Sequence, residues 1–470
     1  MMTRPDFLQL DAEAAEPLYR QIYTRFRNAI AEGLLQPGTR IPAARALALE
    51  LGLARGTVES AYSLLTAEGY VETRGQAGTV VTPALQRHAP VAAAAPAPDP
   101  VRALAGSPTS ARPFQMGLPA LDAFPRKVWA RLAARAVRAT LAEDMVYPPY
   151  AGVPQLRTAI ATYLQLSRGI NCAPSQVFVT SGYRNTMELV ARALLQPGDA
   201  VWFEDPGYPP TRALLKEAGM RTIPVPVDAE GLVVARGIAA APSARAAVVT
   251  PAHQSPLCVS LSLPRRLALL EWAAQAGAWI VEDDYDGEYR YVSRPLPALQ
   301  SLDRDGRVLY AGTFSKVLMP AARVAYLVVP PEQVERFEYI SQTFAGGGPT
   351  LMQHIVSDFM NEGHFARHIQ RMRRLYAERR QSAAEALADV LGAHFHIDPQ
   401  PGGMHLVLRM DGPLTDRELA ARMHRDGMAA HALSDFTVLP GAAAGLLLSF
   451  TNIDTPARAR ELGRRILSLL

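Results

Sequence analysis

The sequence predicts two folded parts, an α+β module over residues 1–82 and a larger α/β domain over residues 114–470. Three observations support this division. The first 82 residues read as three helices followed by a β-hairpin. Residues 83–113 hold seven prolines among alanines, which is typical of a semi-stiff linker. From residue 114 onward, short apolar runs alternate with helical patterns, which predicts a largely parallel sheet.

Composition favours a soluble cytoplasmic protein. The two cysteines, Cys172 and Cys258, give neither a disulfide framework nor zinc-ligand spacing. Residues 1–17 lack the apolar centre of a secretory signal, and no run of eighteen apolar residues predicts a membrane span. We therefore expect a cytoplasmic location and no membrane partner.

The N-terminal module shows apolar residues at helical spacing in three stretches, 17–32, 42–51 and 54–68. Two β-like runs, 70–73 and 79–81, follow and predict a hairpin. This order is that of a winged helix-turn-helix, whose third helix reads the major groove of DNA. Net charge adds no support, because residues 1–82 hold eight arginines and nine acids. A helical module for protein contact is the alternative.

The motifs PLYRQI, LQPGTRIP, LALELGLARGTVESAY, LTAEGYVETR and GTVV resemble those of the GntR class of DNA-binding domains. The resemblance implies double-stranded DNA as a partner. The implied DNA contacts are Arg45, Arg55, Gly56 and Thr57, with Gly78 and Thr79 in the wing. Two departures are visible: Ala43 and Ala44 replace serines, and the wing reads Gly75-Gln76-Ala77-Gly78. Lost hydroxyl contacts would weaken phosphate positioning more than sequence readout.

The stretch from Gly312 to Arg323 directs the interpretation of the larger domain. Lys316 is one of three lysines in the chain, and it follows a predicted buried strand at 308–311. A lysine can lose its proton and attack a carbonyl, whereas an arginine cannot. Thr313, Ser315 and Arg323 offer donors to a phosphate. These residues suggest pyridoxal 5′-phosphate held as an internal aldimine on Lys316; a surface lysine in a Ser/Thr loop is the alternative.

Four other predicted strands end in residues that suit this cofactor. Ser181, Gly182 and Tyr183 follow the first strand and open a helix, which makes a natural phosphate cup. The second strand leads to Tyr208, an aromatic face on which a ring can stack. The strands are predicted at 177–180, 200–203, 246–250 and 278–281.

The third and fourth strands lead to His253-Gln254 and to the acidic stretch 282–286. A buried carboxylate beside the pyridine nitrogen of the cofactor keeps that nitrogen protonated. His253 can equally be a structural histidine, and the acids can form an exposed turn. An acidic metal site is disfavoured, because no histidine with ligand spacing accompanies the acids.

The motifs EDPGY, PAHQSPL, GAWIVEDDYDGEYRY, RPLPALQ, GTFSKVL and GHFARHIQRMRRLY resemble the MocR subgroup of GntR regulators, which fuse a winged helix to a fold-type-I aminotransferase domain. This resemblance implies a large domain at about 147–340, a small domain at about 345–470 and a homodimer. It also implies Lys316 as the Schiff-base residue and Tyr147 reaching the site of a neighbouring subunit. The other implied cofactor contacts are Asp283, Tyr285, Tyr208, Gln254, Ser181, Gly182, Tyr183, Ser315 and Arg323.

Three departures bear on activity: Arg184 replaces glutamine, Cys258 replaces glycine, and Leu447 stands where aminotransferases have the arginine that binds the substrate carboxylate. Losing that partner removes a contact worth about 1.5–3 kcal/mol, so efficient transamination is not expected. The basic stretch 364–376 is interpreted as an amphipathic helix with a solvated face rather than a second nucleic-acid site.

We expect a regulator that senses the cofactor or an amino compound through Lys316. An aminotransferase with a vestigial reader is the second hypothesis, and a protein-binding scaffold without cofactor is the third. The sequence leaves the effector open among an amine, an amino acid with a distal carboxylate and the cofactor itself. It also leaves open the operator and the direction of regulation.

Overall fold

The computed structural model describes residues 7–470 except 12, 13, 15, 76–77, 84–110, 292–296, 346, 399–401 and 442–443. The chain divides into two compact units, Met1–Ser107 and Pro108–Leu470, and each is described by itself. Most of the predicted linker lies outside the described residues, as do the wing residues Gln76 and Ala77. Within the described part of the chain, no helix has the length and apolar character needed to span a bilayer.

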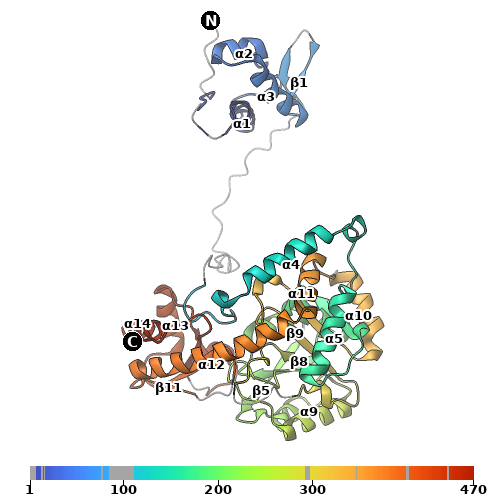
Figure 1. Ribbon diagram of the computed structural model, residues 1–470, viewed down its shortest axis with the longest axis vertical. Helices are drawn as coiled ribbons and strands as arrows, with labels where there is room; N and C mark the ends of the chain where they lie inside the picture. Colours follow the sequence, from blue (N-terminus) through green and yellow to red (C-terminus); the bar gives the residue numbers. More distant parts are fainter. Residues whose placement is uncertain are drawn as a thin grey trace. The chain divides into compact units, whose positions relative to one another are not determined.

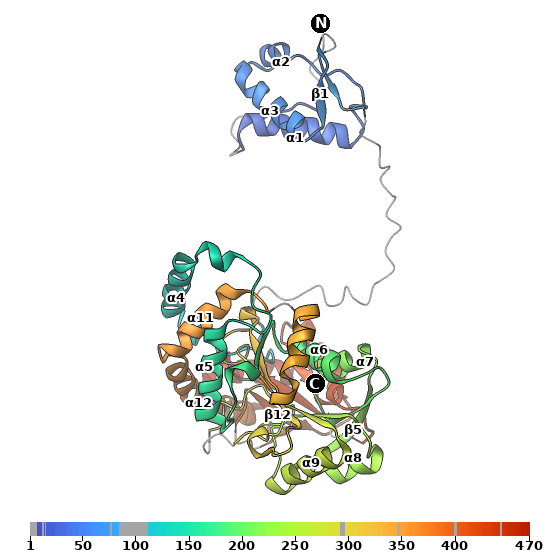
Figure 2. The same cartoon turned by 90° about the vertical axis from the view of Figure 1, so that its right-hand side faces the viewer.

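The N-terminal unit has three helices and a two-stranded sheet, as the sequence predicts (Figures 1 and 2). Gly52 separates the second and third helices in a left-handed turn with φ +68°. The apolar faces of all three helices and of the hairpin meet in one core that includes Phe26, Leu47, Val58 and Val81. The elements are α1 (Leu18–Ala31), α2 (Ala44–Leu51), α3 (Arg55–Ala67), β1 (Val71–Thr73) and β2 (Thr79–Val81).

The larger unit is built on an eight-stranded sheet in the order β3-β10-β9-β8-β7-β4-β5-β6. The five central strands, from β9 to β5, are parallel, while β10 and β6 run antiparallel to their neighbours. The five predicted strands are all present as β3, β4, β7, β8 and β9. The strands are β3 (Val177–Thr180), β4 (Ala200–Asp205), β5 (Arg221–Asp228), β6 (Gly231–Leu232), β7 (Ala246–Val249), β8 (Trp279–Asp284), β9 (Val308–Thr313) and β10 (Ala325–Val328).

Successive side chains of each buried strand point to opposite faces of this sheet, so apolar side chains lie on both faces. Helices cover both faces. On β8, Val281 packs with α6, α7 and α10, whereas Ile280 packs with α8 and α9. Next to α8 and α9 on the same face lie α5 and α11. The helices are α5 (Pro154–Arg168), α6 (Tyr183–Leu194), α7 (Pro209–Glu217), α8 (Val234–Ala240), α9 (Leu263–Ala276), α10 (Val334–Ile340) and α11 (Thr350–Asn361).

A second, four-stranded antiparallel sheet has the order β11-β12-β14-β13 and packs with α13 (Asp416–Arg425) and α14 (Pro456–Leu467). The segment before α4 (Arg126–Ala139) belongs with it, since Phe114 forms a β-bridge with Ser449. The strands are β11 (Phe395–Ile397), β12 (His405–Met410), β13 (His431–Ala432) and β14 (Gly445–Ser449).

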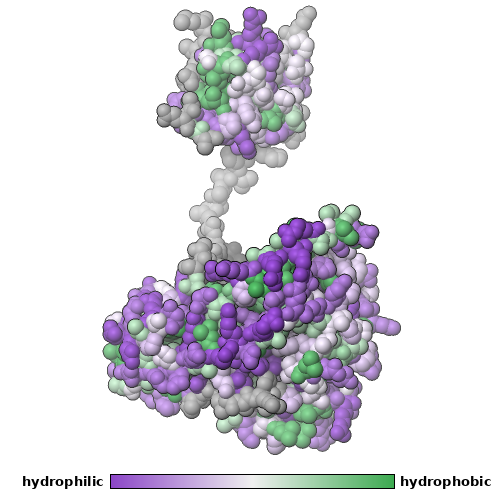
Figure 3. Space-filling view, viewed as in Figure 1, coloured by the Kyte–Doolittle hydropathy of each residue, from purple (hydrophilic) through white to green (hydrophobic). Residues whose placement is uncertain are grey.

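The long helix α12 (His364–Leu391) connects the two cores. Its first turns carry Phe365 and Ile369 into the core of the large sheet, and its later turns carry Met372 and Tyr376 into the core of the small sheet. The predicted start of the small domain near residue 345 is therefore too early, because the apolar side of α11 packs on the large sheet. Hydrophilic side chains cover α12 and α4 in Figure 3, as expected of an amphipathic helix at the surface.

Candidate functional site

A cavity of about 670 Å³ lies in the larger unit, where the carboxyl ends of strands β8 and β9 face residues of the small sheet. Such strand ends are where open α/β sheets bind ligands. Seven of the predicted cofactor residues line the cavity together: Tyr183, Tyr208, Asp283, Tyr285, Ser315, Lys316 and Arg323. These residues come from four separate stretches of the chain, so the fold brings together what the sequence only suggested.

Lys316 lies just beyond β9, and its Nζ donates a hydrogen bond of 3.1 Å to the carbonyl oxygen of Gly117. Burial lowers the pKa of this amine, while the nearby carboxyls of Asp286 and Asp283 act in the opposite direction. A lowered pKa increases the fraction of neutral amine, which is the nucleophilic form. Lys316 is thus placed and tuned to attack a carbonyl.

A cradle for an anion lies at the N-terminus of α6. Gly182 adopts φ +103° there, and a Cβ at this position would come within 3.0 Å of the Arg323 guanidinium. That guanidinium has no hydrogen-bond or ion-pair partner among the residues that the structure describes. Together with the backbone amides of the first turn of α6, it can bind a phosphate. Ser181 and Arg184 lie beside it, since both line an adjoining cavity with Arg323.

Asp283 is the carboxylate of β8 that lines the cavity, and Asp286 and Asp435 line it from outside that strand. Burial raises the pKa of Asp283 to about 8, and a hydrogen bond from Tyr183 partly offsets this rise. The Tyr183 hydroxyl in turn accepts a hydrogen bond of 3.1 Å from Thr211 Oγ1. A cationic group placed beside Asp283 would therefore stabilise its ionised form.

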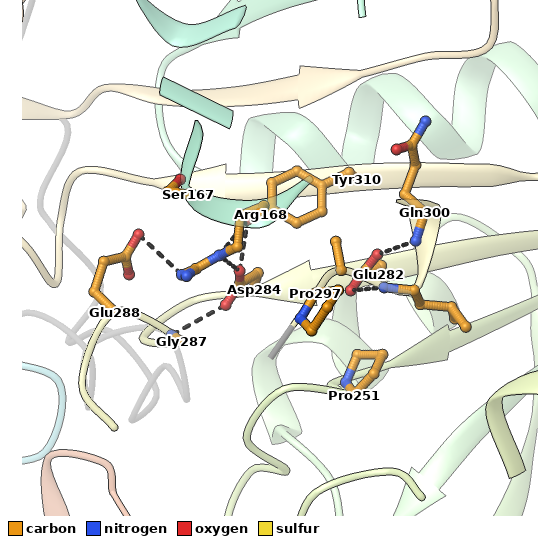
Figure 4. A network of polar contacts seen from close by, with 12 residues as sticks. Ser167, Arg168, Pro251, Glu282, Asp284, Gly287, Glu288, Pro297, Gln300 and Tyr310 are labelled. Atoms are coloured by element: carbon orange, nitrogen blue, oxygen red, sulfur yellow. Dashed lines mark hydrogen bonds and ion pairs between the residues drawn. The ribbon is translucent and has the colours of Figure 1, made fainter. Parts of the chain in front are cut away.

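The acids on either side of Asp283 point away from the cavity, because alternate residues of β8 face opposite sides. Glu282 accepts hydrogen bonds of 2.8 Å from the amides of Leu299 and Gln300 (Figure 4). Asp284 accepts hydrogen bonds from Arg168 Nε at 2.6 Å and from the Tyr310 hydroxyl at 2.5 Å. Their partners show that these two acids have structural roles. Among the described residues, no group of His, Cys, Asp or Glu is arranged to hold a metal ion.

His253 lies behind the cavity and supports two residues that line it. Its Nδ1 is 3.0 Å from Asp286 Oδ1 and 3.2 Å from the Tyr285 hydroxyl. Its Nε2 has no hydrogen-bond partner among the described residues. The structural role considered for His253 in the sequence therefore agrees with its position.

Four of the eleven predicted cofactor residues do not line the cavity: Ser181, Gly182, Gln254 and Tyr147. The Gln254 side-chain amide donates hydrogen bonds of 2.8 Å to the carbonyl oxygens of Pro206 and Ser255, and its oxygen accepts one from the Leu257 amide. Gln254 thus stabilises its own loop, and its expected place near the ring stays a prediction. Tyr147 is 93% exposed, so any contact it makes with a site would be in another subunit.

Other lining residues were not predicted. Gly117 and Met116 come from the segment before α4, and His405, His431 and Asp435 come from the small sheet and its loops. They belong to no recognisable motif, and their positions follow from tertiary packing. Leu447 on β14 is fully buried in an apolar cluster with Val407, Leu433 and Phe436.

The N-terminal unit presents the predicted DNA contacts at its surface. Arg45 on α2 and Arg55 on α3 are both exposed, and Arg55 Nε forms an ion pair of 2.7 Å with Glu59. The guanidinium of Arg40, which the sequence did not single out, lies about 3 Å from where a Cβ on Gly78 would be. This places an arginine beside the wing.

Family models and known proteins match both units. The model for bacterial regulatory proteins of the gntR family matches residues 18–81, and that for aminotransferase class I and II matches residues 120–446. A probable rhizopine catabolism regulatory protein, MocR, of Rhizobium meliloti is 38% identical over 97% of this chain and 94% of that protein. The pyridoxine biosynthesis transcriptional regulator PdxR of Corynebacterium glutamicum is 34% identical over 92% of each chain.

A solved structure is similar to the larger unit. It is the α-aminoadipate aminotransferase LysN of Thermus thermophilus, complexed with N-(5′-phosphopyridoxyl)-L-leucine. That chain is 28% identical to this one, with a TM-score of 0.68 over 76% of this chain and 92% of that chain. The similarity covers the unit that contains Lys316 and the cavity.

Proposed function

We propose, since the chain belongs to the MocR-type regulators of the gntR family, that it is a transcriptional regulator. These regulators carry an aminotransferase class I and II domain. In this chain that domain would bind pyridoxal 5′-phosphate in the Lys316 cavity and respond there to an amino compound. The observation that carries this proposal is the occurrence in one chain of an exposed arginine-bearing helix-turn-helix and a half-buried lysine in a cofactor-sized cavity.

The residues of the cavity fit the cofactor. Lys316 would hold it covalently, and Arg323 with the N-terminus of α6 and Ser315 would hold its phosphate. Asp283 would pair with the ring nitrogen, whose positive charge compensates the cost of burying an ionised carboxylate. When bound, the cofactor supplies an aldehyde that exchanges reversibly between amines.

Regulation requires that the effector bind two states of the protein with different affinity. The cavity is formed by the large sheet, the small sheet and the segment around Gly117. Lys316 itself contacts the carbonyl oxygen of Gly117, so a change in the position of its side chain would change the contacts between these three parts. Such a change would give an effector different affinities for the two states.

We also propose a homodimer. Five large apolar side chains are exposed between α4 and α5: Leu141, Met145, Val146, Tyr147 and Tyr150. Exposed apolar groups of this kind mark interaction sites, and Tyr147 in this segment does not line the cavity of its own chain. A dimer would present two DNA readers and would need two half-sites.

The cofactor is tested by the absorbance spectrum of the full-length protein mixed with pyridoxal 5′-phosphate. We expect a visible band that survives dialysis in the wild type and in Lys216→Ala, an exposed lysine of α7, but not in Lys316→Ala. A band that persists in Lys316→Ala would overturn the assignment of this lysine. Absence of the band from all three proteins would overturn the cofactor.

The reader is tested by gel shift with a promoter fragment. We expect Arg45→Ala combined with Arg55→Ala to weaken binding at least about tenfold and to reduce its salt dependence. Arg25→Ala on α1 removes one exposed arginine from the same unit and serves as the control. Unchanged affinity of the double variant would remove the assignment of these two contacts.

An aminotransferase is the second candidate function, favoured by the similarity to LysN and by the intact pair of Lys316 and Asp283. The apolar surroundings of Leu447 disfavour it. Turnover of an amino donor on the order of 1 per second would establish an enzyme, whereas a single slow half-reaction is compatible with a regulator.

A further inference from the structure

Among the described residues that line the cavity, those contributed by the small sheet include no arginine or lysine, and the guanidinium of Arg417 contacts Asp435 from outside the lining. Met404, Phe436 and the neighbouring Met116 make this wall of the cavity apolar, and His405, His431 and Asp435 are its polar groups. Leu447 packs directly behind it, paired in register with His431. A ligand held at Lys316 would turn its other end toward this wall or toward the opposite wall at α6.

The lining arginines lie on the α6 side. Arg184 and Arg323 line both this cavity and the adjoining one bounded by α6 and α7, so they are grouped at the anion cradle. Arg323 is committed to the phosphate in the proposed function, on which this inference rests. Positive charge is therefore concentrated where the cofactor phosphate would lie, away from the small sheet.

The polar groups of the small-sheet wall are poor partners for a carboxylate. Asp435 carries a negative charge, as a carboxylate ligand does. Its Oδ1 accepts a hydrogen bond of 2.8 Å from Arg417 Nε, and this exposed pair lies at the rim of the cavity. Burial and the nearby His424 lower the pKa of His431, which favours its neutral form. His405 Nε2 lies 2.9 Å from the Pro256 carbonyl oxygen and 3.3 Å from Cys258 Sγ, so this edge of the ring is already occupied.

Asp435 and the neutral form of His431 can accept hydrogen bonds from hydroxyl or ammonium groups. We propose that the effector is a primary amine without an α-carboxylate, whose other end carries hydroxyl groups or a second ammonium group read by Asp435 and His431 against the apolar wall of Met404 and Phe436. A carboxylate on the carbon that bears the amine would lose its bound water on entering the cavity, and it would find no cationic side chain on this wall to pair with.

The test uses matched amines on the full-length protein loaded with pyridoxal 5′-phosphate. Ethanolamine and L-serine differ by one carboxylate, and ethanolamine and ethylamine differ by one hydroxyl. Loss of the visible band of the bound cofactor is followed as each amine is added, and the free cofactor is titrated alongside to correct for intrinsic reactivity. The change in melting temperature gives a second readout.

We expect ethanolamine to act at about a tenfold lower concentration than L-serine, since like charges placed together are strongly disfavoured. We expect ethylamine to act several-fold more weakly than ethanolamine. The preference of the protein for ethanolamine is the ratio of the L-serine and ethanolamine concentrations that give the same effect. Asp435→Asn should reduce this ratio at least threefold, because the charge that repels the carboxylate is removed. Asp411→Asn, an exposed residue outside the cavity lining, should leave the preference unchanged.

L-serine acting as well as ethanolamine on the wild type, or a preference unaffected by Asp435→Asn, would overturn the inference. If Arg184→Gln abolishes the response to L-serine, the carboxylate is read at α6 and the inference is equally wrong. Failure of the proposed function is distinguishable, because no cofactor band would then form before any amine is added.

Discussion

Lys316 Nζ and the carbonyl oxygen of Gly117 are 3.1 Å apart, although 199 residues separate them in the chain. The segment that carries Gly117 also joins the small sheet through the bridge of Phe114 to Ser449. The lysine that would hold the cofactor is thus in contact with a segment anchored in the small sheet. A change at Lys316 has a direct route to the packing between the two sheets.

Gly117→Ala is expected to weaken cofactor binding by about tenfold or more. Gly117 adopts φ +79°, and an added Cβ would lie 2.5 Å from Lys316 Nζ, so the lysine must move. A misplacement of a reacting group by about 1 Å can lower a reaction rate by about a hundredfold. A tenfold loss of cofactor affinity is therefore a moderate expectation. The measurement is a titration with pyridoxal 5′-phosphate followed by absorbance.

Gly427→Ala is the matched control for Gly117→Ala. Gly427 has φ +82°, but a Cβ there would meet no heavy atom within 4 Å. The control shares the backbone strain of an alanine at positive φ and lacks the clash with the lysine. Equal cofactor affinity of the two variants would show that the contact with Lys316 has no part in binding.

Asp283→Asn is expected to make the cofactor-free protein more stable at high pH and to change little at pH 4. Burial raises the pKa of Asp283 to about 8, above its value of about 4 in the unfolded chain. The folded state therefore binds the proton more tightly, and the wild type loses stability as pH rises from about 4 to about 8. At about 1.4 kcal/mol per pKa unit, the difference at pH 8 has an upper limit of about 5 kcal/mol.

Urea unfolding followed by tryptophan fluorescence measures this effect, because all four tryptophans lie in the larger unit. Glu204 and Glu282, whose pKa burial also raises to about 7, are present in both proteins, so the cost of burying these two carboxyls cancels in the comparison. A constant difference between wild type and variant from pH 4 to pH 8 would contradict the prediction. Cofactor loading should reverse the order, since a protonated ring nitrogen pairs with an ionised carboxylate.

The sequence predicted the five strands, the helices and hairpin of the N-terminal unit, and seven of the residues that line the cavity, because these depend on local patterns. The run Glu282 to Asp286 shows the limit of such patterns. Along β8, alternation brings Asp283 into the cavity lining and leaves out Glu282 and Asp284, while Tyr285 and Asp286 line the cavity from beyond the strand. Which face of the strand meets the cavity depends on the strands beside it. His405 and Asp435 could not be predicted, because the packing of the small sheet brings them to the site and no local pattern marks them.

Arg168→Met is expected to destabilise the larger unit by about 3–5 kcal/mol. Arg168 and Asp284 are joined at 2.6 Å with side chains 1% and 2% exposed, and Arg168 also pairs with Glu288 at 3.2 Å (Figure 4). Removing the cation leaves two buried carboxylates without their partner. Urea unfolding followed by tryptophan fluorescence gives the change in free energy.

Arg192→Ala is the control for Arg168→Met. Arg192 pairs with Glu188 at 2.9 Å on the surface of α6, where both side chains are about half exposed. Such a pair contributes about 0.3–0.5 kcal/mol. If Arg168→Met costs no more than this control, the buried network is not what fixes the end of β8.

Cys258→Gly is expected to give a more stable protein than Cys258→Ala, by about 1 kcal/mol. Cys258 adopts φ +63°, a conformation that costs a residue with a Cβ about 1–2 kcal/mol and a glycine almost nothing. Both variants remove the thiol, whose Sγ lies 3.3 Å from His405 Nε2, so the loss of that contact cancels between them. The two free energies of unfolding come from urea titrations at pH 7.

A second consequence of Cys258 concerns the charge of His405. Burial raises the pKa of the thiol, but His405 and His253 outweigh it and bring the pKa down to about 6. Burial likewise lowers the pKa of His405, and the charge of Cys258 outweighs this effect and raises it. Both variants should therefore lower the pKa of His405, as followed by NMR of its ring protons. If the pKa of His405 is the same in Cys258→Gly as in the wild type, Cys258 and His405 do not form a charged pair beside the cavity.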